Sequence, residues 1–422
     1  MDLFEKSFEK ILNENINAKT ILKKVVDKKY QDIGIKIEEN KLTEIIDMLV
    51  AKQGETLNVH IEDECIVESK INHENADGEI LNIEINDSDI DDVFNRVLST
   101  LPEIYNNSVE TTANGLLKNI RRKLPFILKK NKSEREIFEK ELKKLWNKPI
   151  KLLEFFIFLV IDIGANFNNH YGKIALKKND VVFEVLLRLF ARSCQIASEI
   201  LVLLKAGFPD GAHARWRTLH EIAVVAMFID KHGDEVAKRY LLHEYVEDYK
   251  GAVQHQHFCE STNNIPLTDE EFEEIETNYQ NVINRFGSDF RGDYGWASRI
   301  LNNKKPNFSD IEKDVQLDKW RPDYKLASHN VHANSMGLSF KLGRLPGDSK
   351  SLLIGASMIG IDEAGQGTAV SLLKVITTLL FRKTNMDVLI SCSILMKLEN
   401  EISSEFIKVR KMIEQHKESI TI

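Results

Sequence analysis

The chain has 422 residues, of which 43% are hydrophobic and 29% charged, with 8 prolines and 20 glycines. This balance excludes a wholly disordered chain, a collagen-like repeat and a disulfide-stapled scaffold, and the few prolines and glycines argue against a loop-rich all-β protein. The formal net charge of −8 is uneven, because residues 51–100 carry thirteen acidic residues against three basic ones, whereas residues 118–148 carry twelve basic residues against four acidic ones.

The first third of the chain mixes two periodicities. Residues 1–50 place apolar residues at helical spacing. Residues 57–61 and 83–85 alternate apolar and polar side chains on either side of an Asp77-Gly78 turn, which predicts a hairpin. We therefore expect residues 1–148 to form a smaller α/β region with a short antiparallel hairpin. Its basic segment, residues 118–148, is either a solvated face or a nucleic-acid contact, and no internal repeat is apparent.

Beyond Pro149 the pattern is almost entirely helical. A long apolar helix is predicted over residues 181–204, a turn at 207–211 and a second helix to about residue 229. Capping boxes at Thr268 and Ser309 predict two further helix starts, and residues 367–381 and 386 to about 415 predict two terminal helices. Short turns between helices imply antiparallel neighbours. The fold class is thus mainly α, with residues 149–422 as an antiparallel helical bundle.

One predicted helix, residues 212–229, carries a polar stripe on an otherwise apolar surface. His213, Arg217, His220 and Glu221 fall within about 100° of one another on this helix, at 100° per residue. Because such a helix is buried on most sides, its polar residues need partners. The candidates are Arg188 and Arg192 on the preceding helix, and Arg239 lies on the following one. The stripe is interpreted either as a buried ion-pair network that fixes helix register or as a polar substrate-binding pocket.

A second polar pattern follows near residue 330. Tyr324, Ser328 and His332 are spaced four apart and share a helix face if the helix extends that far. An imidazole can move a proton near neutral pH, and a serine four residues before it suggests a nucleophile and its base. The alternative is that His332 hydrogen-bonds a carbonyl at a helix end.

Sequence features that govern location and cofactors are sparse. The longest apolar runs, residues 155–161 and 352–361, are shorter than the roughly 20 residues of a membrane span, and no signal peptide is visible. The four cysteines are widely spaced and form no Cys-x-x-Cys pair. We therefore expect a cytoplasmic protein that does not associate with membranes, and no cofactor or metal.

The run Arg217-Thr218-Leu219-His220-Glu221 after a long helix, with the later Tyr324, Ser328 and His332, resembles an uncharacterised bacterial helical family, domain of unknown function five-six-seven-seven. The resemblance spans about residues 180–385. A weaker resemblance is to the helical ribonucleases known as HEPN domains, whose signature is an Arg followed four to six residues later by a His. Arg215 and His220 have that spacing, although Trp216 stands where those domains usually have Asn, Asp or His.

These resemblances and residues support two hypotheses. The first is a metal-independent, ribonuclease-like effector of a bacterial defence or toxin system. In it Arg217, Glu221, His332 and Ser328 are catalytic. The substrate-binding residues would be Arg188, Arg192, His220, Tyr324 and Arg239. The second is a non-catalytic helical interaction module in which the same residues are internal struts. Candidate partners are RNA, a protein or a second copy of the chain.

Overall fold

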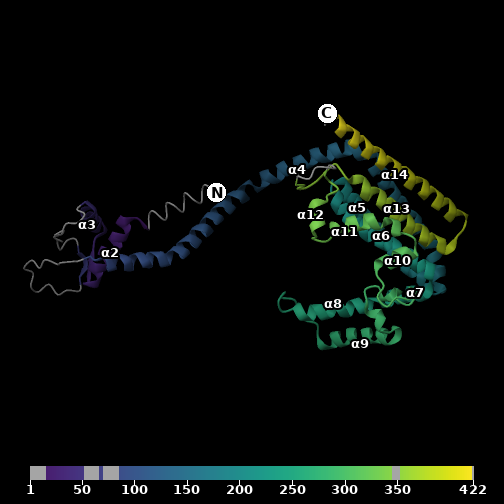
Figure 1. Cartoon of the computed structure of the whole chain (residues 1–422), viewed down its shortest axis with the longest axis horizontal. Coiled ribbons are helices and arrows are strands. Elements are labelled where there is room, and N and C mark those ends of the chain that lie inside the picture. The colour runs from purple at the N-terminus through teal and green to yellow at the C-terminus, as the bar shows by residue number, and fades with distance from the viewer. Residues whose placement is uncertain (1–15, 52–65, 70–84, 345–351, 421–422) are drawn as a thin grey trace, which may run out of the picture. The chain divides into compact units, whose positions relative to one another are not determined.

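The computed structural model describes residues 16–51, 66–69, 85–344 and 352–420. The chain is mainly helical, as predicted, and divides into two compact units, Met1–Lys132 and Ser133–Ile422 (Figure 1). The division falls within one long helix, α4 (Asp87–Lys177). That helix continues through Pro102, Pro125 and Pro149, so Pro149 ends no helix. The sequence-based division into residues 1–148 and 149–422 stays a prediction about which parts fold separately.

The first unit has a small α/β arrangement. Its elements are α2 (Ala18–Asp32), β1 (Ile35–Ile37), α3 (Glu39–Ala51), β2 (Ile66–Ser69) and the first part of α4. The two strands pair antiparallel, with Ile35 opposite Ser69, so β1 interrupts a stretch that the sequence predicts as helical throughout. The predicted hairpin over residues 57–61 and 83–85 lies outside the described residues, except for Ile85, which belongs to no strand.

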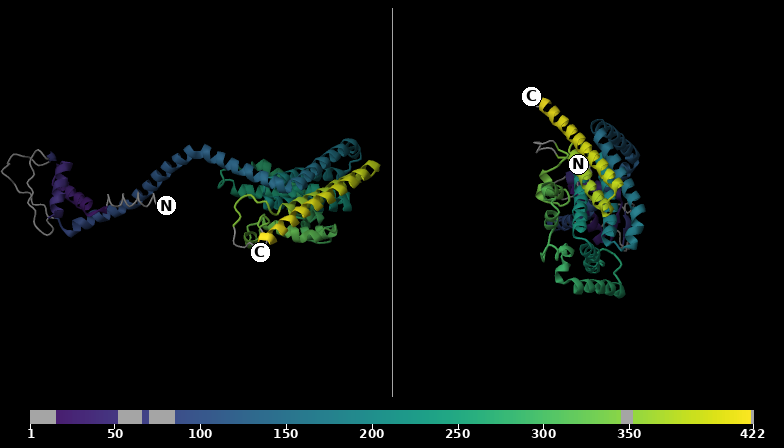
Figure 2. Two further views of the ribbon diagram at one scale, coloured as in Figure 1. Left: turned by 90° about the horizontal axis from the view of Figure 1, so that it is seen from above. Right: turned by 90° about the vertical axis from the view of Figure 1, so that its right-hand side faces the viewer.

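The second unit is organised around three packed helices, α5 (Val181–Lys205), α6 (Pro209–His232) and α13 (Ile361–Leu380). The turn between α5 and α6 is so short that these two helices run antiparallel, as predicted. Helix α14 (Met386–Ile420) packs along α13 (Figures 1 and 2). Gly367 lets α13 approach α6 closely, because a Cβ at this position would lie 2.6 Å from Nε1 of Trp216.

Shorter elements surround this core. In chain order they are α7 (Asp234–Leu242), α8 (Glu244–Phe258), α9 (Asp269–Phe286), η2 (Ser288–Arg291), η3 (Gly295–Ala297), α10 (Phe308–Asp314), η4 (Asp318–Trp320), α11 (Arg321–His329), α12 (Ser335–Ser339) and η5 (Phe381–Lys383). The capping box at Thr268 is confirmed, with Glu271 as its reciprocal partner. The second box begins at Asn307 with Asp310, rather than at Ser309 as the sequence predicts.

One helical stretch, Ile361–Lys383, is long and apolar enough to cross a membrane by composition alone. Its most apolar window is 67% buried within the unit, where it forms the centre of the three-helix core. Core helices of water-soluble proteins have the same composition, so this stretch is weak evidence for a membrane span.

Candidate functional site

A polar cluster joins α6 to α11. The Tyr324 hydroxyl donates to Oε1 of Glu221 at 2.5 Å and accepts from Nη2 of Arg217 at 2.9 Å. Arg217 and Glu221 also form an ion pair at 3.2 Å, one turn apart on α6. A single phenol is thus held between a guanidinium and a carboxylate, and its hydroxyl hydrogen bonds are charge-assisted.

The cluster is open to solvent on one side. The side chains of Arg217 and Glu221 are 22% and 30% exposed, whereas Tyr324 is 7% exposed. The sequence predicts that the arginine and the glutamate are buried and paired across the bundle. They are only partly buried, and their partner across the bundle is Tyr324 rather than Arg188 or Arg192. Part of each charged side chain therefore contacts solvent, while the phenol ring is packed in the core.

The two nearby phenols are neutral at pH 7. Burial raises the pKa of Tyr324, and its hydrogen bond to the Glu221 carboxylate raises it further. Burial also raises the pKa of Tyr294 to about 12, with a smaller contribution from the charge of Glu221. Tyr324 therefore acts as a neutral hydrogen-bond donor that orients the Glu221 carboxylate.

A second guanidinium lies over the same phenol ring. The Cζ atoms of Arg217 and Arg321 lie 4.9 and 5.3 Å from the centre of the Tyr324 ring. Arg321 is 22% exposed and forms a 2.9 Å ion pair with Glu312, which is 0% exposed. The other oxygen of Glu312 lies 2.9 Å from Nε2 of His220, which is itself buried. His220 therefore belongs to an internal network behind the cluster.

Several buried polar atoms on these elements have no hydrogen-bond partner among the described residues. They include Nε of Arg217, Nε1 of Trp320 and both amide atoms of Asn330. Buried donors and acceptors are nearly always satisfied in folded proteins. The Nε–H of Arg217 is thus a buried donor without a partner among the described residues, and only the outer part of this guanidinium meets solvent.

The other predicted arginines have different roles. Arg188 is exposed and pairs with Glu184 on its own helix, and Arg192 is also exposed. Arg239 is buried and donates to the carbonyls of Trp296 and Gly295, so it anchors the η3 turn. None of the three hydrogen-bonds Arg217, Glu221 or Tyr324 within the described ranges.

The expected stripe of Tyr324, Ser328 and His332 is only partly formed. The Ser328 hydroxyl donates to the Tyr324 carbonyl at 2.8 Å, which is a local helix bond. Helix α11 ends at His329, and His332 is exposed beyond it. The backbone N–H of His332 donates to the Ser328 carbonyl at 3.0 Å, and no hydrogen bond joins these two side chains in the part of the chain that the structure describes.

Sequence reasoning missed Glu312 and Arg321. Glu312 was interpreted only as part of a capping pattern, although it follows Ile311 on a short helix whose buried face it shares. Arg321 directly precedes Pro322 at the start of α11, and no periodic signal marks it. The contact between α10, α11 and α6 is what gives these residues their place.

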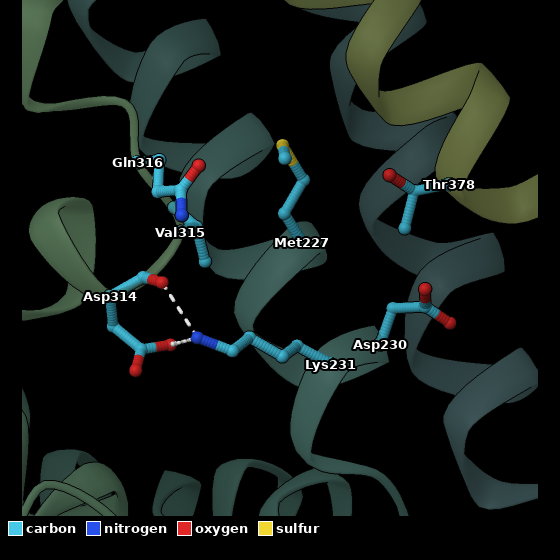
Figure 3. Close-up of a pocket in the computed structure, with 7 residues that line it drawn as sticks. All are labelled: Met227, Asp230, Lys231, Asp314, Val315, Gln316 and Thr378. Atoms are coloured by element: carbon cyan, nitrogen blue, oxygen red, sulfur yellow. Dashed lines mark hydrogen bonds and ion pairs between the residues drawn. The ribbon is translucent and has the colours of Figure 1, made fainter.

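A hollow opens further along α6, away from this polar cluster. It has a volume of about 300 Å³ and is lined by Met227, Asp230, Lys231, Asp314, Val315, Gln316 and Thr378. Figure 3 shows Lys231 reaching across to Asp314, where its ammonium donates to the backbone carbonyl at 2.7 Å. The opening is thus spanned by an internal ion pair. Among the described residues, no group of three His, Cys, Asp or Glu side chains is placed to hold a metal ion.

Comparison with known proteins identifies one family. Its model, described as "Family of unknown function (DUF5677)", matches residues 183–349, from the first turn of α5 to beyond α12. The resemblance inferred from the sequence is thus confirmed for this stretch, which contains the whole Arg217–Glu221–Tyr324 cluster. No curated protein and no solved structure matches the chain.

Proposed function

We propose that the chain is a metal-independent, ribonuclease-like effector of a bacterial defence or toxin system, and that the Arg217–Glu221–Tyr324 cluster is its active site. The observation that supports this most is the partly exposed carboxylate of Glu221, which accepts from the Tyr324 hydroxyl and pairs with Arg217, while the guanidinium of Arg321 lies over the same Tyr324 ring. A general base beside fixed positive charge is the arrangement that phosphodiester cleavage requires without a metal.

The proposed reaction is an internal transfer in RNA. Glu221 removes the proton from a ribose 2′-hydroxyl, and the 2′-oxygen attacks the adjacent phosphorus. The bond from phosphorus to the 5′-oxygen breaks, and the protonated Glu221 returns the proton to that leaving oxygen. The products are a 2′,3′-cyclic phosphate and a 5′-hydroxyl end, so atoms and charge balance. Arg217 and Arg321 stabilise the negative charge on the phosphate oxygens.

The HEPN-like pairing of Arg215 and His220 does not carry this proposal. Arg215 forms an ion pair with Glu199 on α5, and His220 is buried against Glu312. We therefore assign the positive charge to Arg217, which lies on a different face of α6 from Arg215, and the role of general base to Glu221. His332 is exposed beyond the end of α11 and has no step in this reaction, and a catalytic role for it is tested separately.

The test is cleavage of a short single-stranded RNA in the presence of a chelator. Wild-type protein is expected to release 2′,3′-cyclic phosphate ends and to leave the 2′-deoxy oligonucleotide intact. Glu221→Gln, which keeps the side-chain shape, is expected to lose roughly 10²–10⁴-fold in rate. Arg299→Ala is the matched control, because Arg299 is 74% exposed on the same unit and pairs with Glu235 rather than with the cluster.

An inactive wild-type protein under every inducing condition, with no growth arrest on expression, would refute the ribonuclease proposal. The non-catalytic interaction module then takes its place. A specific observation favours that second candidate: each charged group of the network, Arg217, Glu221, Arg321 and Glu312, already has an oppositely charged partner inside the chain. In the interaction module these pairs only fix the packing of α10 and α11 on α6.

A further inference from the structure

The part of α4 within the first unit presents an exposed apolar face. Phe94, Leu98, Tyr105 and Val109 are 37–44% exposed, although Val93 and Val97 on an adjacent face are buried against α2. The face continues through Leu116, Ile120 and Ile127, and the same segment also exposes four apolar residues that lie outside this row: Leu117, Leu124, Phe126 and Leu128. Large apolar residues in such a continuous row are costly to leave in water.

These seven residues follow a regular spacing. Along α4 they are alternately four and seven residues apart, from Phe94 to Ile127. At 100° per residue they fall within an arc of about 80°. An eleven-residue repeat is 3.67 residues per turn, so it keeps an apolar stripe on one side of an α-helix with little drift, which is the pattern of helices that pack lengthwise on a partner helix. We call residues Phe94, Leu98, Tyr105, Val109, Leu116, Ile120 and Ile127 the α4 stripe.

Charge is divided between the two halves of this segment. Residues 87–112 contain six acidic residues and one basic residue, Arg96, whereas residues 113–132 contain seven basic residues and no acidic one. Two such helices side by side in parallel place like charges together. Reversing one of them places the acidic half of each helix against the basic half of the other.

The stripe is also symmetric about its centre. When two copies run antiparallel, Leu98 of one copy can lie opposite Ile127 of the other, Tyr105 opposite Ile120, and Val109 opposite Leu116, all in one register. Only six of the seven residues take part in these pairs, with Phe94 beyond the end. A two-fold interface of this kind uses the same patch on both copies.

From the spacing, the exposure and the charge division, we infer that two copies of this chain associate through the α4 stripe in antiparallel orientation. This interface lies on the first unit and is independent of the proposed active site on the second. In this dimer the basic residues within 118–132 face the acidic half of the partner helix rather than nucleic acid.

The test uses the full-length chain and measures its mass in solution by sedimentation equilibrium. Wild-type protein is expected to be a dimer, and Leu116→Glu is expected to raise the dissociation constant by at least about tenfold, because each dimer buries two unpaired carboxylates. Leu128→Glu is the control. Leu128 is 57% exposed on the same segment but lies outside the stripe. A monomeric wild type at about 100 μM, or equal effects of the two substitutions, would overturn the inference.

Orientation is tested by disulfide cross-linking. A mixture of Leu98→Cys and Ile127→Cys chains, in a Cys65→Ser background, is expected to form the mixed dimer covalently. The three other native cysteines are buried. Efficient cross-linking of Leu98→Cys to itself, or dimers that tighten as salt increases, would show parallel packing and contradict the proposal. If the wild type is monomeric and deleting residues 1–15 makes it dimerise, the chain's own beginning covers the stripe, and the inference is likewise overturned.

Discussion

Replacing Glu312 by Ala is expected to destabilise the second unit strongly. Glu312 is fully buried and its two oxygens each lie 2.9 Å from a partner, Nε2 of His220 and Nε of Arg321. Removing the carboxylate leaves a guanidinium without its counter-charge in a site that is only partly hydrated. Loss of one member of a buried pair costs about 3–5 kcal/mol. Because Arg321 is 22% exposed, the lower end, about 3 kcal/mol, is the better estimate.

Thermal unfolding followed by tryptophan fluorescence measures this change cleanly. All four tryptophans, Trp146, Trp216, Trp296 and Trp320, lie in the second unit, so the signal reports that unit alone. At about 2–4 °C for each kcal/mol, Tm should fall by about 6–12 °C. The control is Glu184→Ala, which breaks an ion pair whose side chains are 49% and 65% exposed and should cost less than about 1 kcal/mol. Equal shifts for the two variants would refute the assignment of Glu312 as a buried charged strut.

Four further outcomes are expected. Burial lowers the pKa of His213 to about 4. Because the unfolded chain binds this proton at a higher pH than the folded chain does, the free energy of unfolding should be greatest above pH 6.5 and fall by about 3 kcal/mol as the pH drops to 4. Unfolding measured at several pH values should show a weaker pH dependence for His213→Phe. Burial raises the pKa of the Cys194 thiol to about 12. After treatment with a maleimide at pH 8, mass spectrometry should therefore find Cys194 unmodified in the native protein and modified in denaturant. Rapid labelling of the native protein would contradict its burial. His332→Ala should stay folded yet lose RNA cleavage and growth arrest if His332 is catalytic; unchanged cleavage would remove it from the site. Limited proteolysis should cut near residues 128–150 and leave a folded helical C-terminal fragment, whereas an insoluble fragment would contradict the division into separable parts.

The helical class and the pairing of α5 with α6 could be predicted because both depend on local signals. The apolar period of residues 181–204 and the break at Gly207-Phe208-Pro209 fix the ends of two neighbouring helices. Thr268 and Glu271 likewise mark a helix start through bonds made within four residues.

The continuity of α4 could not be predicted in this way. Proline disfavours a helix interior by about 3 kcal/mol, so Pro149 was interpreted as a boundary. The structure continues the helix through it, with Leu142 and Trp146 buried just before it and Leu153 and Phe156 just after. Tertiary packing on both sides outweighs the local preference. The eleven-residue spacing of the α4 stripe went unnoticed for the same reason, because it emerges only when the helix runs unbroken through Pro102 and Pro125.

The site was predicted in part. The periodicity of α6 placed Arg217 and Glu221 on one face, and Tyr324 was singled out as polar and helical. Their meeting depends on how α11 packs on α6, which no local pattern encodes. His332 was expected one turn beyond Ser328, but α11 ends at His329 and that extrapolation fails.

The central claim, that the Arg217–Glu221–Tyr324 cluster binds the phosphate of RNA, is tested most directly by binding of a cleavage-resistant 2′-deoxy analogue. Fluorescence anisotropy compares wild type, Arg217→Gln and the exposed-site control Arg299→Ala. We predict that Arg217→Gln weakens binding by about tenfold or more, as expected for losing a charge-assisted phosphate contact, while Arg299→Ala leaves the dissociation constant unchanged. Equal affinities for wild type and Arg217→Gln would contradict the claim.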